Sequence, residues 1–174
     1  MDCTHIPEIS CFYSDTIASH ILNPSAHFEY EMILVTDGSA QVQIHDRTYP
    51  LQRGSLLFIS RLEQHKFCIV KEPYCRYVLS VSSDLLLSHL NEPRLASIFM
   101  QRPEYFSHVV QLNEEQLAYF LPFFQKSADE YEKQPDFYTL QSIALLLLIL
   151  ISLYRLYPNA FPMEDSSSLS AAVL

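Results

Sequence analysis

The sequence is poor in several residue types, and each shortage excludes a class of protein. Its 174 residues include two glycines, Gly38 and Gly54, and no tryptophan. Basic residues are the scarcer charge, because 11 lysines and arginines stand against 20 acidic residues and leave a formal net charge of −9. An acidic surface repels the phosphate backbone, so this chain is not expected to grip nucleic acid itself.

Signals for covalent chemistry and for secretion are also missing. The four cysteines, Cys3, Cys11, Cys68 and Cys75, match neither zinc nor thioredoxin spacings. We expect reduced thiols, with a Cys68–Cys75 disulfide as the lesser alternative. The N-terminal segment carries acids and a proline in place of an apolar run, so a cytoplasmic protein without a secretory signal is expected. No Gly-x-Ser-x-Gly and no phosphate loop occurs, and no nucleophile constellation indicates an enzyme.

What is present is a large apolar fraction, 49% of the chain, which is enough for a globular domain with a core. Residues 1–26 are interpreted as an irregular N-terminal arm with a short strand near 9–13. Turn signals such as Asp37-Gly38 then divide a run of alternating sequence into short strands. These strands are predicted at 28–36, 40–45, 48–51, 55–60, 67–70 and 76–82. Many short strands with closely spaced turns indicate a β-barrel or sandwich.

Helical periodicity replaces the strand pattern after residue 83. Short helices are predicted at 84–90 and 94–100, and long ones at 114–133, after the N-cap Asn113, and at 137–157. The last helix is apolar on all sides, but its uncharged run of about a dozen residues is shorter than the roughly 20 that a membrane span needs. We interpret it as a helix with one face on the barrel and another on a second subunit. The predicted dimer contacts are Leu140, Ile143, Leu147, Leu150 and Tyr154.

Three polar residues predict a ligand site inside the barrel. His27 and Glu31 are four residues apart, a spacing that places both side chains on one face of a strand. His65 arrives on a later strand, so the three are expected to be neighbours. They are interpreted as anchors for a small ligand, with a hydrogen-bonded scaffold and a divalent-metal site as alternatives.

A fourth candidate comes from the strand predicted at 76–82. Arg76 and Tyr77 lie on opposite faces of it, so one of them points into the barrel. Tyr77 is taken as a ligand-binding residue, because an aromatic ring can stack on a sugar or an aromatic ligand, and a place in the core is its alternative. Other histidines, among them His45 and His108, show no partner spacing and are predicted to be incidental.

Short motifs in this region carry a family resemblance. Residues 27–38 read His-x3-Glu-x6-Gly and resemble the first cupin motif, and residues 54–65 read Gly-x4-Ile-x5-His and resemble the second. Residues 49–59, Tyr-Pro-Leu-Gln-Arg-Gly-Ser-Leu-Leu-Phe-Ile, are similar to the N-terminal effector-binding domain of AraC-type transcription regulators.

The resemblance implies a mainly β fold with C-terminal helices. A cupin barrel (a double-stranded β-helix, or jelly roll) is expected at 27–82, and residues 83–157 are expected to contain a two-helix antiparallel dimerisation hairpin. The barrel would bind a small-molecule effector, and the chain would form a homodimer through its C-terminal helices. Residues 158–174 are similar to a linker and the opening of a helix-turn-helix domain. DNA would be contacted only through that missing domain, and no membrane is involved.

One departure from the cupin pattern concerns metal. Metal-binding cupins usually begin with His-x-His, and Ser25 stands at the earlier position here. We therefore expect no metal or other cofactor. The alternatives are a small metal-dependent cupin enzyme that uses His27, Glu31 and His65, and a plain dimerisation module whose barrel binds nothing.

Overall fold

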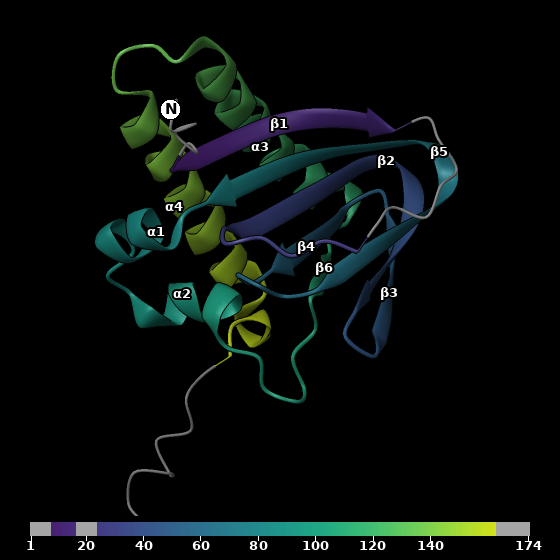
Figure 1. The fold of residues 1–174 in the computed structure, drawn as a ribbon. Coiled ribbons are helices and arrows are strands. Elements are labelled where there is room, and N and C mark those ends of the chain that lie inside the picture. Colours follow the sequence, from purple (N-terminus) through teal and green to yellow (C-terminus); the bar gives the residue numbers. More distant parts are fainter. Residues whose placement is uncertain (1–7, 17–23, 163–174) are drawn as a thin grey trace, which may run out of the picture.

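The computed structural model describes residues 8–16 and 24–162 (Figure 1). The opening of a helix-turn-helix domain predicted near the C-terminus lies outside the described residues. In chain order the elements are β1 (Ile9–Thr16), β2 (Tyr30–Ile44), β3 (Arg47–Gln52), β4 (Ser55–Ile59), β5 (His65–Val81), α1 (Ser83–His89), α2 (Pro93–Met100), β6 (Val109–Gln111), α3 (Glu114–Lys133), α4 (Tyr138–Leu156) and the 3-10 helix η1 (Pro158–Ala160).

The strands form one antiparallel sheet in the order β1-β5-β2-β4-β6, with β3 paired to β2. The predicted cupin fold with C-terminal helices is confirmed, although the sheet does not close completely. Part of the predicted N-terminal arm is a full edge strand, because β1 pairs with β5 along its whole length. The short strand β6 was not predicted, since three residues are too few for an alternating pattern to show.

β2 and β5 are each one long strand where two short strands were predicted. The prediction of a hairpin turn at Asp37-Gly38 was wrong: β2 continues through it, and its register with β5 shifts between Val35 and Ala40. Gly38 has a φ of 70°, and an added Cβ would lie 2.1 Å from the carbonyl oxygen of Pro73. A glycine with positive φ serves a β-bulge as well as a hairpin turn, and here it bends the two strands together.

The bend rolls the β2–β5 ribbon back on itself. Ile44 pairs with His65 at one end of the ribbon, and Tyr30 pairs with Val81 at the other. Ser25, a few residues before Tyr30, nevertheless exchanges two backbone hydrogen bonds with His65, at 2.9 and 3.1 Å. The roll gives the sheet a concave face, filled by a cluster that includes Val42, Ile33, Leu57 and Phe67.

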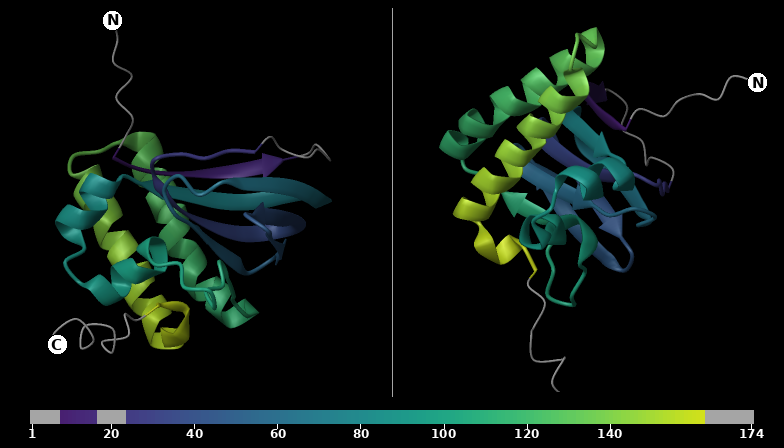
Figure 2. Two further views of the ribbon diagram at one scale, coloured as in Figure 1. Left: turned by 60° about the horizontal axis from the view of Figure 1, so that its bottom comes forward. Right: turned by 90° about the vertical axis from the view of Figure 1, so that its left-hand side faces the viewer.

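The convex face of the sheet is covered by helices. α3 and α4 lie side by side as an antiparallel hairpin against it (Figure 2), as the fold resemblance implied. α3 begins where predicted, because the Asn113 side chain accepts from the Gln116 amide and the Gln116 side chain accepts from the Asn113 amide. Beneath the helices lies a second apolar cluster, which includes Met32, Phe58 and Phe124.

α4 is apolar because one side of it completes this core. Its 19 residues are long and apolar enough to cross a membrane by length and composition alone. Ile143 and Leu150 are buried within the protomer, at 7% and 0% exposed, which corrects their assignment to a dimer contact. Leu147 and Tyr154 are partly buried against the same core, and Leu140 is exposed. The most hydrophobic stripe of the helix faces this core, and the opposite side of α4 is left exposed.

Of the predicted free thiols, Cys11, Cys68 and Cys75 are confirmed as unpaired. Cys3 lies outside the described residues.

Candidate functional site

The structure brings together the three polar residues singled out in the sequence. The ligand atoms of His27, Glu31 and His65 all lie within 4.8 Å of one another, and the two imidazole ring centroids are 5.1 Å apart. Glu31 is on β2 and His65 begins β5, whereas His27 lies in the segment before β2 and not on a strand. The roll of the sheet, more than the spacing along one strand, makes these residues neighbours.

His27 and Glu31 form an ion pair. His27 Nε2 lies 3.1 Å from Glu31 Oε2, and His27 Nδ1 lies 3.0 Å from the carbonyl oxygen of Glu29. The Glu31 carboxylate raises the pKa of His27 above its ordinary value, against the opposing effect of burial. Nδ1 donates to the Glu29 carbonyl oxygen, whereas the buried Nε2 faces the Glu31 carboxylate without forming a hydrogen bond. The Ser80 hydroxyl donates to Glu31 Oε1 at 3.1 Å, which orients the carboxylate further.

His65 is held by the protein on both sides of its ring. It is 4% exposed, and burial lowers its pKa, so the ring is neutral near pH 7. Nδ1 donates to the carbonyl oxygen of Glu63 at 2.9 Å, and Nε2 accepts from the Ser25 hydroxyl at 2.8 Å; these partners assign the tautomer. His65 is therefore a scaffold residue at the edge of the site.

The hydrogen bonds of His65 fit a role as a ligand of a divalent metal poorly. Each imidazole ligand must offer a free lone pair to the metal. The Nε2 lone pair of His65 already accepts from the Ser25 hydroxyl, although the buried Nε2 of His27 has no hydrogen-bond partner of its own. Ser25 thus stands where a metal-binding cupin has a histidine, and its hydroxyl donates a hydrogen bond to His65. The donor set does not favour the metal-dependent enzyme.

β5 turns Arg76 toward the concave face. Arg76 pairs with Val35, whose side chain belongs to the concave cluster, and cross-strand partners share a face. Its guanidinium donates to Thr16 Oγ1 at 2.9 Å and lies 4.7 Å from the centroid of the Tyr74 ring. The sequence left Arg76 and Tyr77 open as lumen residues, and the structure selects Arg76.

Tyr77 lies on the opposite, convex side. Its ring centroid is 5.2 Å from that of Tyr13 and 6.4 Å from that of Phe124 on α3. Tyr77 therefore does not line the same site as His27 and Glu31, and any ligand that it binds would lie on the convex side.

The concave face has polar groups at two ends and apolar groups between them. Arg76 and Ser80 are four residues apart on β5, a separation of about 13 Å along a strand. Val78 lies between them on the same face, and its partner on β1 is Phe12, which is 46% exposed. A guanidinium therefore stands at one end of this face and the Glu31 carboxylate at the other.

The buried carboxylate of Glu63 lies next to the site, two residues before His65. Glu63 is 7% exposed, and its Oε1 lies 2.9 Å from His108 Nε2 and 3.1 Å from Arg102 Nε. Burial alone would raise the pKa of Glu63, but His108, Arg102 and the Ser60 amide lower it to about 2. The backbone carbonyl of this residue accepts from His65, so Glu63 joins the site to the chain after α2. The prediction that His108 is incidental was wrong.

Comparisons with known proteins agree with this fold. The family model for the AraC-like ligand binding domain matches residues 7–150. A structure of apo ToxT from Vibrio cholerae aligns with a TM-score of 0.57 and 10% identity, over 92% of this chain and 61% of that chain. The Cnp3 cupin domain of Schizosaccharomyces pombe aligns with a TM-score of 0.42 and 10% identity, over 48% of this chain and 63% of that chain. The chain thus spans about three fifths of these solved structures. No curated protein matches the sequence.

Proposed function

Because the chain belongs to the AraC-like ligand-binding domain family, we propose that it is the effector-sensing and dimerisation domain of an AraC-type transcription regulator. Such a regulator works in the cytoplasm. DNA would be contacted by a separate helix-turn-helix domain, since an acidic domain of net charge −9 is unsuited to hold it.

The distribution of polar groups on the concave face carries this proposal. Arg76 offers a planar guanidinium suited to a carboxylate or phosphate, and Glu31 accepts hydrogen bonds from a hydroxyl or an amine. Phe12, which pairs with the buried Val78, supplies exposed apolar surface between these ends. The effector class that fits is a short, extended molecule with an anionic group at one end, a hydrogen-bond donor at the other and an apolar middle.

Sensing requires two states of the domain that the effector distinguishes. β1 is an edge strand held only by β5 within the sheet, and it contributes Phe12 to the concave face and Thr16 to the Arg76 contact. An effector that touches both strands would favour the state in which β1 is paired. It shifts the equilibrium only by its difference in affinity for the two states.

A thermal-shift screen tests this effector class. Bifunctional acids of graded length, with a terminal amine or hydroxyl, are compared with simple monocarboxylic acids and with uncharged diols. We expect the bifunctional acids of matching length to raise the melting temperature by about 5–10 °C at a hundredfold excess over Kd. Arg76→Leu and Glu31→Gln should each abolish most of this rise. Arg61→Leu, which removes an exposed guanidinium elsewhere, should keep it. No hit in any class would support the module that binds nothing, and a hit that survives both variants would place the binding site away from Arg76 and Glu31.

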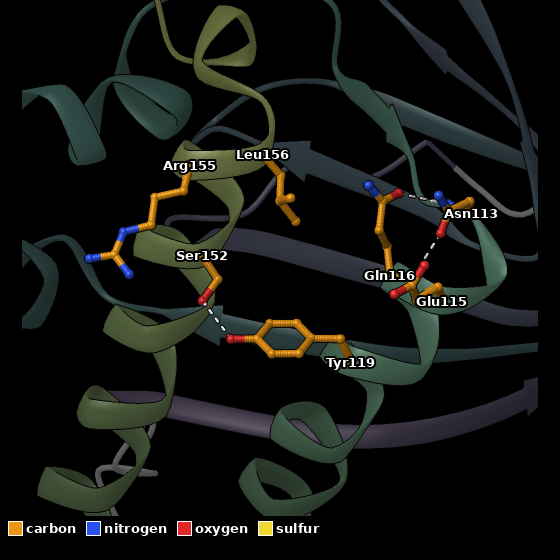
Figure 3. A pocket seen from close by; sticks show the side chains of 7 residues that line it. All are labelled: Asn113, Glu115, Gln116, Tyr119, Ser152, Arg155 and Leu156. Carbon is orange, nitrogen blue, oxygen red and sulfur yellow. Dashed lines mark hydrogen bonds between the residues drawn. The ribbon is translucent and has the colours of Figure 1, made fainter.

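Homodimerisation is proposed through the outward side of α4. Leu140, Leu148 and Leu156 are 56%, 49% and 48% exposed, and Ala144 lies exposed between the first two. Exposed apolar residues at helical spacing favour the antiparallel packing of two such helices. A groove of about 410 Å³ between α3 and α4 continues this surface (Figure 3). Its lining residues are Asn113, Glu115, Gln116, Tyr119, Ser152, Arg155 and Leu156.

A charge on this surface should separate the subunits. Leu148→Glu places a carboxylate where two apolar helices would meet, and we expect the dimer dissociation constant in sedimentation equilibrium to rise at least about tenfold. Leu87→Glu is the matched control, since Leu87 is 55% exposed on α1. A wild-type chain that remains monomeric at high concentration, or equal weakening by both variants, would refute this interface.

A further inference from the structure

A second hollow lies on the convex side of the sheet, away from the concave face. Residues of β1, β5 and the C-terminal half of α3 line it, and β1 and α3 pack against each other (Figure 1). Its volume is about 760 Å³, the largest among the hollows described for this fold. Its lining includes Cys11, Phe12, Tyr13 and Tyr77 from the sheet and Asp129 and Glu132 from α3.

Aromatic rings form the sheet side of this groove. The Tyr13 and Tyr77 ring centroids are 5.2 Å apart, and the planes are tilted by 56°. Tyr13 is 49% exposed, although a tyrosine on a strand that faces a helix would ordinarily be covered. Burial raises the pKa of Tyr77, so this ring stays a neutral phenol at physiological pH. The face of an aromatic ring is the negative side of its π-system, and the half-exposed Tyr13 ring stands at the groove.

The helix side of the groove is acidic. Asp129 and Glu132 lie on successive turns of α3, and both are exposed. No lysine or arginine is among the described residues that line the groove. The nearest compensating charge is Lys133, whose Nζ is 3.5 Å from Asp129 Oδ2 at the surface, and an exposed pair of this kind is weak.

We propose that this groove binds a small organic cation, such as a quaternary ammonium compound or an alkylated amine. The rings attract a cation through their quadrupoles and also bury its alkyl groups, and the two carboxylates supply the opposite charge. Tyr77 would then bind a ligand on the convex side of β5, opposite the side that carries Arg76. This site shares only Phe12, on the edge strand β1, with the residues named for the proposed effector site, so variants at the other residues test the two sites separately.

Choline and its uncharged tert-butyl analogue form the test pair, because they differ in charge and hardly in shape. In calorimetric titrations of the whole chain at low ionic strength, choline should bind about threefold to tenfold more tightly than the analogue. Tyr13→Leu should weaken choline binding by a similar factor and leave the analogue less affected. Asp129→Asn combined with Glu132→Gln should remove most of the preference for the cation.

Glu114→Gln is the control, because it removes one carboxylate from the exposed first turn of the same helix, outside the groove. It should leave choline binding unchanged. Equal affinity for choline and its analogue would overturn the proposal, as would no binding of either, or a loss as large in the control as in the groove variants. Circular dichroism melts of every variant separate a lost site from a lost fold, and the acid-to-amide variants keep the test usable if Tyr13→Leu does not fold.

Discussion

Gly38→Ala is expected to destabilise the domain by about 3 kcal/mol or more, or to prevent its folding. The φ of 70° at this position is strained for any residue with a Cβ. A Cβ would also lie 2.1 Å from the Pro73 carbonyl oxygen and 2.6 Å from that of Lys71. Both neighbours are backbone atoms of β5, which cannot move aside without opening the ribbon. Urea denaturation followed by far-ultraviolet circular dichroism measures the change.

Ser39→Ala is the matched control for this bend. Ser39 is the next residue of β2 and pairs with Gln52 and Lys71, yet it already carries a Cβ. We expect its free energy of unfolding to stay within about 0.5 kcal/mol of the wild type. If both variants were equally stable, the bulge at Gly38 would not be what rolls the sheet.

Glu63→Gln is the second substitution with a large expected effect. It keeps the shape of the side chain and removes the carboxylate charge, so that the half-buried Arg102 and the buried His108 both lose their charged partner. Breaking a buried pair of this kind costs about 3 kcal/mol or more. Glu114→Gln breaks an exposed pair with Arg53, at 3.0 Å, and should cost less than about 1 kcal/mol.

The pH dependence of stability checks the same group independently. The pKa of Glu63 falls from 4.5 to about 2 on folding, which corresponds to about 3 kcal/mol of stability above pH 4.5. Because the folded pKa is the lower one, this contribution is complete above pH 4.5 and is lost as pH falls toward 2. In Glu63→Gln that portion of the acid decline should be absent. An acid decline identical to that of the wild type would show that other carboxylates cause it.

Local patterns predicted the helices better than the bends. Asn113 and the apolar repeat after it predicted α3, because a cap and a helical period are properties of neighbouring residues. Asp37-Gly38 led to the wrong prediction of a hairpin turn, because a positive φ suits both a turn and a bulge. Only the position of Pro73 on β5 decides between them. The two strands had to be paired before this could be known.

The site was predictable only in part for the same reason. His27, Glu31 and His65 carry a recognisable motif and were expected together. The choice between Arg76 and Tyr77 depends on which face of β5 is concave, which alternation alone does not state. Glu63 and His108 are 45 residues apart and share no motif, so their contact arises only from the packing of the chain after α2 against the barrel.

Amide chemical-shift mapping can locate a small molecule bound on the concave face between β1 and β5. The best compound from the thermal-shift screen is titrated into isotopically labelled protein. We expect the largest amide shifts at Phe12, Arg76 and Ser80, with little change along α4. Shifts confined to the helices, or the same shifts in Arg76→Leu, would contradict it.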